Sequence, residues 1–522
     1  MKKKLYILLS LLAVTGFSCN DFLDEMPDNR AELDSFEKIR KLLVSAYPSH
    51  GYMMVTELSA DNGDDHADNT NTDQFYDQVF YWQDVTAGHN ETPAQIWSGC
   101  YGAIACANQA LAAIEELGNS PEMQPLRGEA LVCRAYAHFV LANVFCQHYS
   151  PAHAGSDLGI PYMEKPETEL APKYDRPSLA SNYEKIAADL EAGLPLIEDK
   201  TYDIPKYHFN KKAAHTFASR FYLYYQQWDK VIEHSTAALG MSPQLLLRDY
   251  VYLNSLPKNL NDVSKKYSGS EVKANFLLLT DYSIAGYALN GAYSNAARYA
   301  HGRMLSQKET IEATGPWGAY SYDTYYLPPY VLVSANMDKV ALPRTPEYFE
   351  FTDPVAATGY YRTVYVPFTA EEALLNRAEA YIIKEDYAAA TADIQLWANN
   401  TIKTGANLIT ETRIASWAND FDYYTPDRPT PKKQINPDFQ ITEGKQENFI
   451  QCLLFIRRIE TMHMGLRWFD LKRYGIEVTR RVLNNGGSLL LETRTTLTKR
   501  HNRYAIQIPL DVRSAGITPN PR

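Results

Sequence analysis

The sequence lacks an excess of positive charge and, beyond its first residues, any long apolar run. Its 51 Lys and Arg residues stand against 62 Asp and Glu residues, for a formal net charge of −11. A chain with this charge repels phosphate backbones and anionic head groups, which argues against nucleic acid and against electrostatic membrane binding. No later stretch approaches the roughly 18 apolar residues of a membrane helix. We therefore expect a soluble, globular body.

Signatures of catalysis and of metal binding are also missing. The 12 histidines are scattered without an HExxH motif, and GxSxG, GxGxxG and phosphate-binding glycine loops are absent. No carboxylate pair can be assigned as acid and base from the sequence, although the two carboxylates of a glycosidase need not be neighbours. We predict a protein that is not an enzyme, and a secreted glycoside hydrolase stays a minor alternative.

Cysteine is scarce, and its positions give no disulfide framework or zinc site. The sequence has six cysteines and no CxxC pair. Apart from Cys19 they lie in apolar helical patterns, where a free thiol packs as a small hydrophobic group. We predict that five are core thiols: Cys100, Cys106, Cys133, Cys146 and Cys452.

The N-terminus has the pattern of an export signal that ends at a lipid anchor. Lys2, Lys3 and Lys4 precede an apolar run from Leu5 to Val14, and Cys19 follows after four more residues. The run is too short to span a bilayer, which is typical of a cleaved signal. We predict a signal peptide over 1–18, acylation of Cys19 and a tether over 19–35; the alternative is an ordinary secretory signal in which Cys19 is incidental. Loss of the three lysines takes the formal charge to −14.

Helical periodicity covers two parts of the chain. Apolar or small residues recur at steps of four and three from Leu126 to Val144, after a helix that Pro93 and Trp97 open. Another helix is predicted from Ser178 to Ile197. Two later segments fit the tetratricopeptide pattern of small and aromatic positions. The first consists of Ser219, Tyr222, Trp228, Val231, Ser235 and Ala238. The second consists of Leu374, Ala378, Tyr381, Tyr387, Ala390 and Ile394, with Trp397 at the last position, where the pattern has a small residue.

Two long segments interrupt the helical pattern. The segment 240–365 is dense in Asn, Ser, Gly and Pro and holds 16 of the 38 tyrosines, and a second irregular segment covers 51–91. The predicted fold class is mostly α, a tetratricopeptide-like scaffold of helical hairpins with large loop-rich excursions and few short strands. We expect one domain over 36–522, with repeats at about 93–240 and 368–400, excursions at about 51–91 and 240–365, and a C-terminal segment over 400–522. Function is expected on the excursions, because loops commonly hold the binding residues that a scaffold positions.

Several short motifs follow one another along the chain: Cys19-Asn-Asp-Phe-Leu-Asp-Glu25, Trp97-x-x-x-Tyr101-x-x-Ile104-x-x-x-Asn108, Arg127-Gly-Glu-Ala-Leu-x-x-Arg134-Ala-Tyr136, Gly159-Ile-Pro161, Asn182-Tyr-Glu-Lys-Ile-x-x-Asp189, Arg457-Arg458-Ile-Glu460, Gly465-Leu-Arg-Trp-Phe-Asp-Leu-Lys-Arg-Tyr-Gly475, Ile508-Pro509 and Asn520-Pro521. In this order they resemble the SusD/RagB family of nutrient-binding outer-membrane lipoproteins of Bacteroidetes. Met464 departs from the acidic residue that commonly precedes the glycine of the C-terminal motif.

The resemblance implies a lipid-anchored protein at the surface of the outer membrane. Such a protein caps a SusC-like TonB-dependent barrel transporter and delivers oligosaccharide to it, while some relatives handle peptides. A peptide-binding or protein-binding uptake subunit of the same architecture is therefore the alternative, since repeat scaffolds often dock proteins. We interpret the motif from Gly465 to Gly475 as structural, with Leu466, Phe469 and Tyr474 buried and its Arg and Asp side chains paired across helical turns.

Aromatic rings flanked by short polar side chains are the chemistry that binds sugars, which present C–H faces and hydroxyl groups. Two segments supply it: Tyr81-Trp82-Gln-Asp84 to His89-Asn90, and Gly315-Pro-Trp317-Gly-Ala-Tyr320-Ser-Tyr322. Trp317 is the first choice, because a Trp in a turn-rich segment is easily presented to solvent; the alternative is that these rings cover the scaffold. Further candidates near the second segment are Asn290, Tyr293, Asn295 and Arg298.

The acidic loop from Asp61 to Asp73 has two possible uses. Its carboxylates could accept hydrogen bonds from sugar hydroxyls, with Asp64 and Asp65 as candidates, and the resemblance implies that this region borders the ligand site. Alternatively Asp61, Asp64 and Asp68 could bind calcium, although the loop lacks the EF-hand order. We expect no cofactor, with a structural calcium ion as the weaker alternative.

Overall fold

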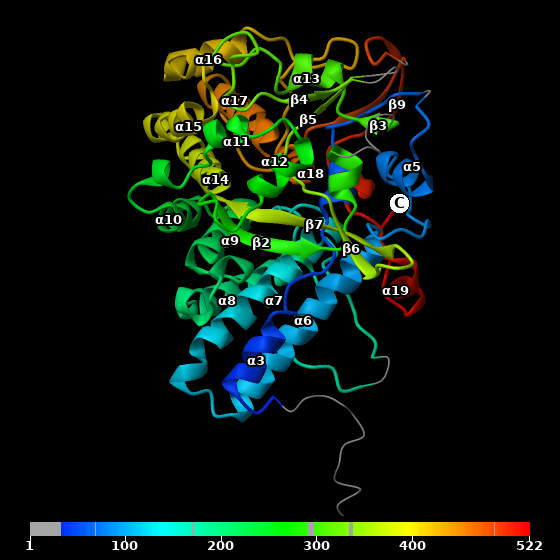
Figure 1. Cartoon of the computed structure of the whole chain (residues 1–522), viewed down its shortest axis with the longest axis vertical. Helices are drawn as coiled ribbons and strands as arrows, with labels where there is room; N and C mark the ends of the chain where they lie inside the picture. The colour runs from blue at the N-terminus through cyan, green and yellow to red at the C-terminus, as the bar shows by residue number, and fades with distance from the viewer. Residues whose placement is uncertain (1–32, 68, 170–171, 291–296, 334–337, 485) are drawn as a thin grey trace, which may run out of the picture.

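The computed structural model describes residues 33–67, 69–169, 172–290, 297–333, 338–484 and 486–522. Helices dominate it, and strands are short (Figure 1). The helices are α3 (Phe36–Leu43), α4 (Met53–Ser59), α5 (Gln74–Phe80), α6 (Pro93–Glu116), α7 (Gln124–Phe145), α8 (Leu179–Gly193), α9 (Lys211–Tyr224), α10 (Trp228–Leu239), α11 (Tyr250–Ser255), α12 (Leu260–Tyr267), α13 (Arg303–Glu309), α14 (Ala370–Ile383), α15 (Tyr387–Thr401), α16 (Glu411–Asn419), α17 (Lys445–Glu460), α18 (Arg467–Tyr474) and α19 (Leu510–Ser514).

The predicted helical hairpins form, and they pack on one another in chain order. Helix α6 packs on α7, α7 on α8, α9 on α10, α10 on α14, and α14 on both α15 and α17. Side-chain caps begin several of them: Thr92 accepts from the Gln95 backbone, and Ser178, at the start of the predicted second helix, accepts from the Ser181 backbone. The mostly α fold class is therefore confirmed.

Small residues allow the close crossing of the second pair of repeat helices. Ser219 of α9 and Ser235 of α10 are fully buried, and their hydroxyl oxygens lie 2.7 Å apart. Asn376 of α14 donates to Ser219 at 3.1 Å, so the two tetratricopeptide-like segments meet at one buried contact although 157 positions separate these residues. The scaffold is thus continuous across the long interruption in the sequence.

The excursions hold more regular structure than the sequence predicted. The segment 51–91 was expected to be irregular but contains α4 and α5, and 240–365 contains α11, α12, α13 and most of the strands. All seven residues of α4 are buried, so it shows no polar face from which a periodic pattern could be recognised. Helix α4, within 51–91, was missed for that physical reason.

Three small sheets lie beside the helices on one side of the molecule. The strands are β1 (Asp64–Asp65), β2 (Asn275–Asp281), β3 (Tyr299–Ala300), β4 (Tyr330–Leu332), β5 (Lys339–Ala341), β6 (Tyr348–Asp353), β7 (Thr358–Thr369), β8 (Val478–Leu483) and β9 (Leu490–Leu497). Their orders are β3-β1-β8-β9, β2-β7-β6 and β4-β5. The first sheet joins chain segments from near the N-terminus, the middle and the C-terminal region, next to α5 (Figure 1).

The C-terminal motif is structural, as its pattern indicated. Every residue of α18 is buried, and Asp470 pairs with Arg473 one turn away and with Arg457 of α17. Gly465, just before the helix, has φ +73°, and a Cβ there would lie 2.3 Å from the Thr56 hydroxyl oxygen. Only glycine fits this backbone.

The five cysteines after Cys19 are free thiols. Cys100, Cys133, Cys146 and Cys452 are buried, whereas Cys106 is half-buried. The prediction of core thiols is therefore confirmed for four of them. Within the described residues, no helix combines the length and the apolar character needed to cross a membrane.

Candidate functional site

The end of helix α5 places two of the predicted aromatic residues in different surroundings. Asp73 caps the start of this helix by accepting from the backbone of Tyr76, and Tyr81 and Trp82 follow its last turn. Trp82 has φ +53°, a left-handed conformation that is uncommon for a bulky residue. Its indole nitrogen donates to the Ser59 carbonyl at 2.9 Å, and the Arg480 guanidinium lies 4.0 Å from its ring. These contacts hold the unusual backbone in place.

Tyr81 belongs to a group of side chains organised by one buried carboxylate. Asp65 is fully buried; it accepts a short hydrogen bond from the Tyr81 hydroxyl and two from Arg298, at 2.8 and 3.0 Å. Arg494 donates to the Tyr81 hydroxyl at 3.0 Å and lies 3.8 Å from Asp65. We call Asp65, Tyr81, Arg298 and Arg494 the Tyr81 cluster.

The first sheet brings the cluster together from distant parts of the chain. Asp65 is on β1, Arg298 directly precedes β3, and Arg494 is on β9. β1 pairs with β3 on one side and with β8 on the other, and β8 pairs with β9. Sheet pairing thus places side chains from three segments beside the end of α5.

The exposed part of the cluster combines an aromatic ring with hydrogen-bond donors. Tyr81 is half-buried, and the side chains of Arg298 and Arg494 are 25% and 42% exposed. Burial, followed by the hydrogen bond to Asp65, raises the pKa of Tyr81 above its usual value, so the ring keeps its proton. A neutral aromatic ring beside two oriented guanidinium groups offers a flat face together with hydrogen-bond donors.

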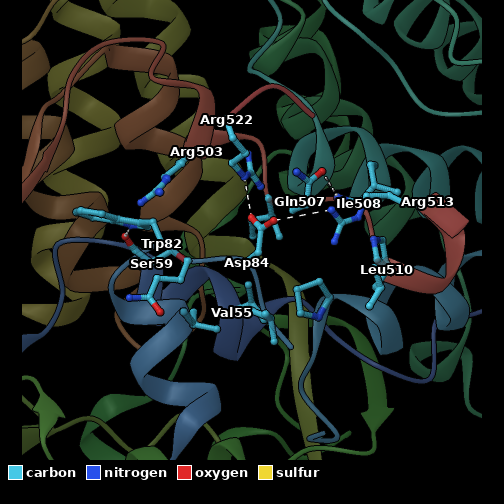
Figure 2. Close-up of a pocket in the computed structure, with 16 residues that line it drawn as sticks. Val55, Ser59, Trp82, Asp84, Arg503, Gln507, Ile508, Leu510, Arg513 and Arg522 are labelled. Atoms are coloured by element: carbon cyan, nitrogen blue, oxygen red, sulfur yellow. Dashed lines mark hydrogen bonds and ion pairs between the residues drawn. The ribbon is translucent and has the colours of Figure 1, made fainter. Parts of the chain in front are cut away.

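Trp82 and Asp84, which follow Tyr81 in the sequence, line a small cavity (Figure 2). Its other polar lining comes chiefly from the C-terminal residues, among them Arg503, Arg513 and Arg522. Asp84 accepts from Arg522 at 2.8 Å and lies 3.9 Å from Arg513. Trp82 is only 5% exposed, so its ring is not an open platform, contrary to the prediction.

The acidic loop pairs with arginines. Asp64 accepts two hydrogen bonds from Arg481, at 2.8 and 2.9 Å, and Asp61 accepts two from Arg467, at 2.8 and 2.9 Å. The carboxylates of Asp64 and Asp65 are buried, so the expectation that they accept directly from sugar hydroxyls is wrong. Burial opposes ionisation of Asp61, but Arg458, Arg467 and Lys433 hold its pKa well below the usual value.

The loop also gives no support for a calcium site. Asp61 and Asp64, two of the three candidate ligands, are occupied by guanidinium groups, and Asp68 lies outside the described residues. In the part of the chain that the structure describes, no group of three or more His, Cys, Asp or Glu side chains is arranged to hold a metal ion.

Trp317, the first choice from the sequence, lies in the core. Its side chain is 3% exposed and stacks on Phe455 of α17 at 5.8 Å between centroids, with Trp397 of α15 at the same distance. Gly405 closes over it, because a Cβ there would lie 2.2 Å from the Trp317 carbonyl oxygen. The expectation that this turn presents Trp317 to solvent is wrong.

Replacement of Trp317 by phenylalanine is expected to lower the free energy of unfolding by roughly 1–2 kcal/mol, since a smaller ring leaves part of the space empty. Ligand affinity is expected to stay unchanged. Urea unfolding and calorimetric titration measure the two quantities. An unchanged stability together with a tenfold weaker affinity would contradict the core assignment.

The remaining predicted residues are distributed more widely. Asn90 is exposed, Tyr320 is half-buried and Tyr322 is 71% exposed. Tyr293 and Asn295 lie outside the described residues, as does Cys19, and the side chain of Asn290 is not described. The structure thus brings together Asp64, Asp65, Tyr81, Trp82 and Arg298, whereas Trp317 belongs to a different part of the core.

Sequence reasoning missed the arginines of the C-terminal strands and an aromatic hairpin. Arg480 and Arg481 on β8 and Arg494 on β9 orient the site, and their only signal was basic residues on strand-like segments. The β6–β7 hairpin exposes a group of aromatic side chains: Tyr348, Phe349, Phe351 and Tyr360. All six residues of β6 are exposed, and β6 pairs only with β7 among the described strands.

Comparisons with known proteins agree with this architecture. Residues 21–223 match a SusD-like family model described as "Starch-binding associating with outer membrane". No curated protein sequence is significantly similar to the chain.

Solved structures show that the likeness in fold extends over nearly the whole chain. A SusD superfamily protein from Bacteroides vulgatus is 18% identical, with a TM-score of 0.62 over 92% of this chain and 97% of that one. A second, from Bacteroides thetaiotaomicron, is 16% identical, with a TM-score of 0.58 over 93% and 98%. A laminarin-binding SusD-like protein is 16% identical, with a TM-score of 0.53 over 93% and 99%.

Proposed function

Because this chain is a SusD-like protein, by the family match over residues 21–223 and by its fold, we propose that it captures oligosaccharide at the surface of the outer membrane. In this proposal Cys19 is the lipid anchor and a SusC-like TonB-dependent barrel receives the sugar. The outer-membrane association described for the family and the laminarin-binding protein of the same fold support the proposal.

The observation on which the proposal rests is the Tyr81 cluster. Asp65 fixes Arg298 by two hydrogen bonds and Tyr81 by a third, so the ring and the guanidinium groups are oriented before a ligand arrives. Such preorganisation favours binding because little side-chain freedom is lost on association. The ring supplies a face for the C–H side of a sugar, and the arginines donate to its hydroxyl oxygens.

We propose binding without chemistry on the sugar. The carboxylates nearest the cluster, Asp64 and Asp65, are held by Arg481 and Arg298 and are poor candidates for an acid and base. Burial raises the pKa of Glu91 to about 7 and that of Asp281 well above its usual value, as an acid catalyst would need. However, these two residues are 3% and 1% exposed, out of reach of a polysaccharide.

Replacement of Tyr81 by alanine tests this site. We expect about tenfold weaker binding of the glycan that the wild-type chain binds most tightly, because the loss of an aromatic contact costs about 0.5–1.5 kcal/mol beyond the area it buries. Calorimetric titration of the chain from Asn20 onward, against plant, host and microbial glycans, measures the affinity. Intact glycan recovered afterwards is the expected result, and turnover would contradict the proposal.

Tyr322→Ala provides the matched control. It removes the same side chain from a position that is 71% exposed and outside the cluster, so its affinity should equal that of the wild type. Equal losses in Y81A and Y322A would contradict the placement of the site at the Tyr81 cluster.

Peptide uptake is the second candidate function, and one observation favours it. The outer edge of β6 faces no other described strand, and an extended peptide can add to such an edge through main-chain hydrogen bonds. Peptides therefore belong in the same titration, and binding of peptides alone would favour this alternative.

A further inference from the structure

The cavity beside Trp82 has an excess of positive side chains in a protein that is acidic overall. Three arginines and one carboxylate, that of Asp84, line it (Figure 2). The formal charge of the chain is −11, so the local excess of positive charge contrasts with the net negative charge of the protein. The free volume is about 40 Å³, which is room for a group of a few atoms.

Two of these arginines have donors without acceptors. The Nε of Arg513 is buried and makes no hydrogen bond within the described residues. Arg503 is half-buried, its guanidinium has no hydrogen bond or ion pair with any described residue, and Figure 2 shows it beside Trp82 and Arg522. For the buried Nε of Arg513 the lack of an acceptor is costly, so a native structure commonly supplies an ion, a water molecule or a ligand there.

The carboxylate in the cavity does not meet this need. Asp84 already accepts from Arg522 at 2.8 Å, and its contact with Arg513, at 3.9 Å, is too long for a hydrogen bond. Among the side chains that line the cavity, one carboxylate stands against three guanidinium groups. Arginine is the residue best suited to bind a carboxylate or a sulfate, because its planar fork presents parallel donors.

We propose that this cavity binds the carboxylate or sulfate group of an acidic oligosaccharide, so that the ligand of this protein is an acidic glycan. The inference rests on the proposed glycan-binding function and names its substrate class. Tyr81 and Asp84 are three positions apart in the sequence, so their Cα atoms are at most about 11 Å apart. When one sugar unit binds at the Tyr81 cluster, a neighbouring unit of the same oligosaccharide can therefore reach the cavity.

Matched ligands test the charge requirement directly. The probes are an oligogalacturonide, the same oligosaccharide with its carboxylates methyl-esterified, a chondroitin sulfate oligosaccharide, a neutral laminarin oligosaccharide and sodium sulfate. At least one of the two acidic sugars is expected to bind about tenfold to hundredfold tighter than the neutral probes, the range expected for hydrogen bonds to a charged group. The preference is expected to shrink as NaCl is added, since salt screens partly exposed charges.

Variants locate the effect. Arg503→Gln and Arg513→Gln are each expected to abolish most of the preference for the acidic probe and to leave weak binding of neutral sugar unchanged. Arg513→Lys, which keeps the charge but loses the fork, is expected to bind at an intermediate level. Arg40→Gln on α3 is the control, because it removes one positive charge from an arginine whose ion pair is with Glu37, outside the cavity.

The melting temperature separates this role from a structural one. Because the Nε of Arg513 has no partner, R513Q is expected to melt at the wild-type temperature without ligand, and only the wild type is expected to gain in melting temperature with the acidic probe. A large loss of melting temperature in both R503Q and R513Q without ligand would assign these arginines to the fold and overturn the inference.

The remaining outcomes distinguish the inference from the proposed function. If the methyl ester or laminarin binds as tightly as both acidic probes, the inference is overturned while glycan capture stands. Acidic binding that survives in R503Q and R513Q also overturns it. If sodium sulfate binds but no sugar does, both the acidic-glycan inference and the proposed function fail.

Discussion

Replacement of Glu309 by glutamine is expected to lower the free energy of unfolding by about 3–5 kcal/mol, the usual cost of breaking a buried ion pair by removing one partner. Glu309 ends helix α13, and its side chain is 1% exposed. Lys433 donates to its carboxylate, Arg458 lies 3.1 Å away and Arg481 lies 2.8 Å away. The variant would leave these three buried cations with only the carboxylates of Asp61 and Asp64, among the described residues, to compensate them.

The same residue makes part of the stability depend on pH. Burial alone would raise the pKa of Glu309, but Lys433, Arg481 and Arg458 lower it from 4.5 to about 2. A carboxyl group whose pKa is lower in the folded than in the unfolded state stabilises the fold fully at pH values above its unfolded pKa. This contribution is lost as the pH falls from about 4.5 toward 2. The contribution amounts to about 3 kcal/mol at neutral pH.

Urea unfolding between pH 7 and pH 2 measures both effects. The free energy of unfolding of E309Q should fall less steeply than that of the wild type below about pH 4.5, because the titrating group is gone. Glu350→Gln is the control, since its ion pair with Arg362 on the exposed hairpin contributes at most about 1 kcal/mol. A loss below about 1 kcal/mol in E309Q, or an unchanged pH dependence, would contradict this description of the network.

Replacement of Asp65 by asparagine is expected to weaken glycan binding by about a hundredfold. The substitution keeps the shape but removes the charge that holds Arg298 by two hydrogen bonds, Tyr81 by one and Arg494 by proximity. Truncation of one partner of a buried charged pair costs about 2–5 kcal/mol. Asp65 is fully buried and does not touch the sugar, so it acts by positioning the residues that do.

Asp77→Asn is the matched control for this effect. Asp77 lies within α5, and its carboxylate also accepts from a tyrosine, Tyr299, but its side chain has no hydrogen bond to Tyr81, Arg298 or Arg494 within the described structure. Calorimetric affinities, taken well below the melting temperature of each variant, should fall for D65N and stay near wild type for D77N. Equal affinities of D65N and the wild type would show that the cluster needs no buried carboxylate.

The sequence was sufficient to predict the scaffold, because helix periodicity and cap residues are local signals. Ser178 caps α8 at the predicted start of that helix, and the small residues at Ser219 and Ala378 mark the helices of the repeats. Strands β2 and β7 were not predicted, since buried strands in a segment rich in loop residues lack clear alternation. Local pattern therefore predicted the helices better than the sheets.

The site depended on pairings that no local pattern encodes. Asp64 meets Arg481 at a separation of 417 positions, and Asp65 meets Arg298 at 233. In the local sequence, the acidic loop resembles a solvated or metal-binding segment. Its arginine partners are not visible there, because they come from β8 and from the residue before β3. Trp317 was misjudged for the same reason: Phe455 and Gly405, which cover it, lie far along the chain.

A crystal structure of the chain with bound oligosaccharide tests the central claim most directly. The glycan for soaking or co-crystallisation is the one that binds most tightly in the titration. The account predicts a sugar ring against Tyr81, with hydroxyl oxygens accepting from Arg298 and Arg494. A sugar bound on the β6–β7 hairpin or in another cavity, with the Tyr81 cluster empty, would contradict it.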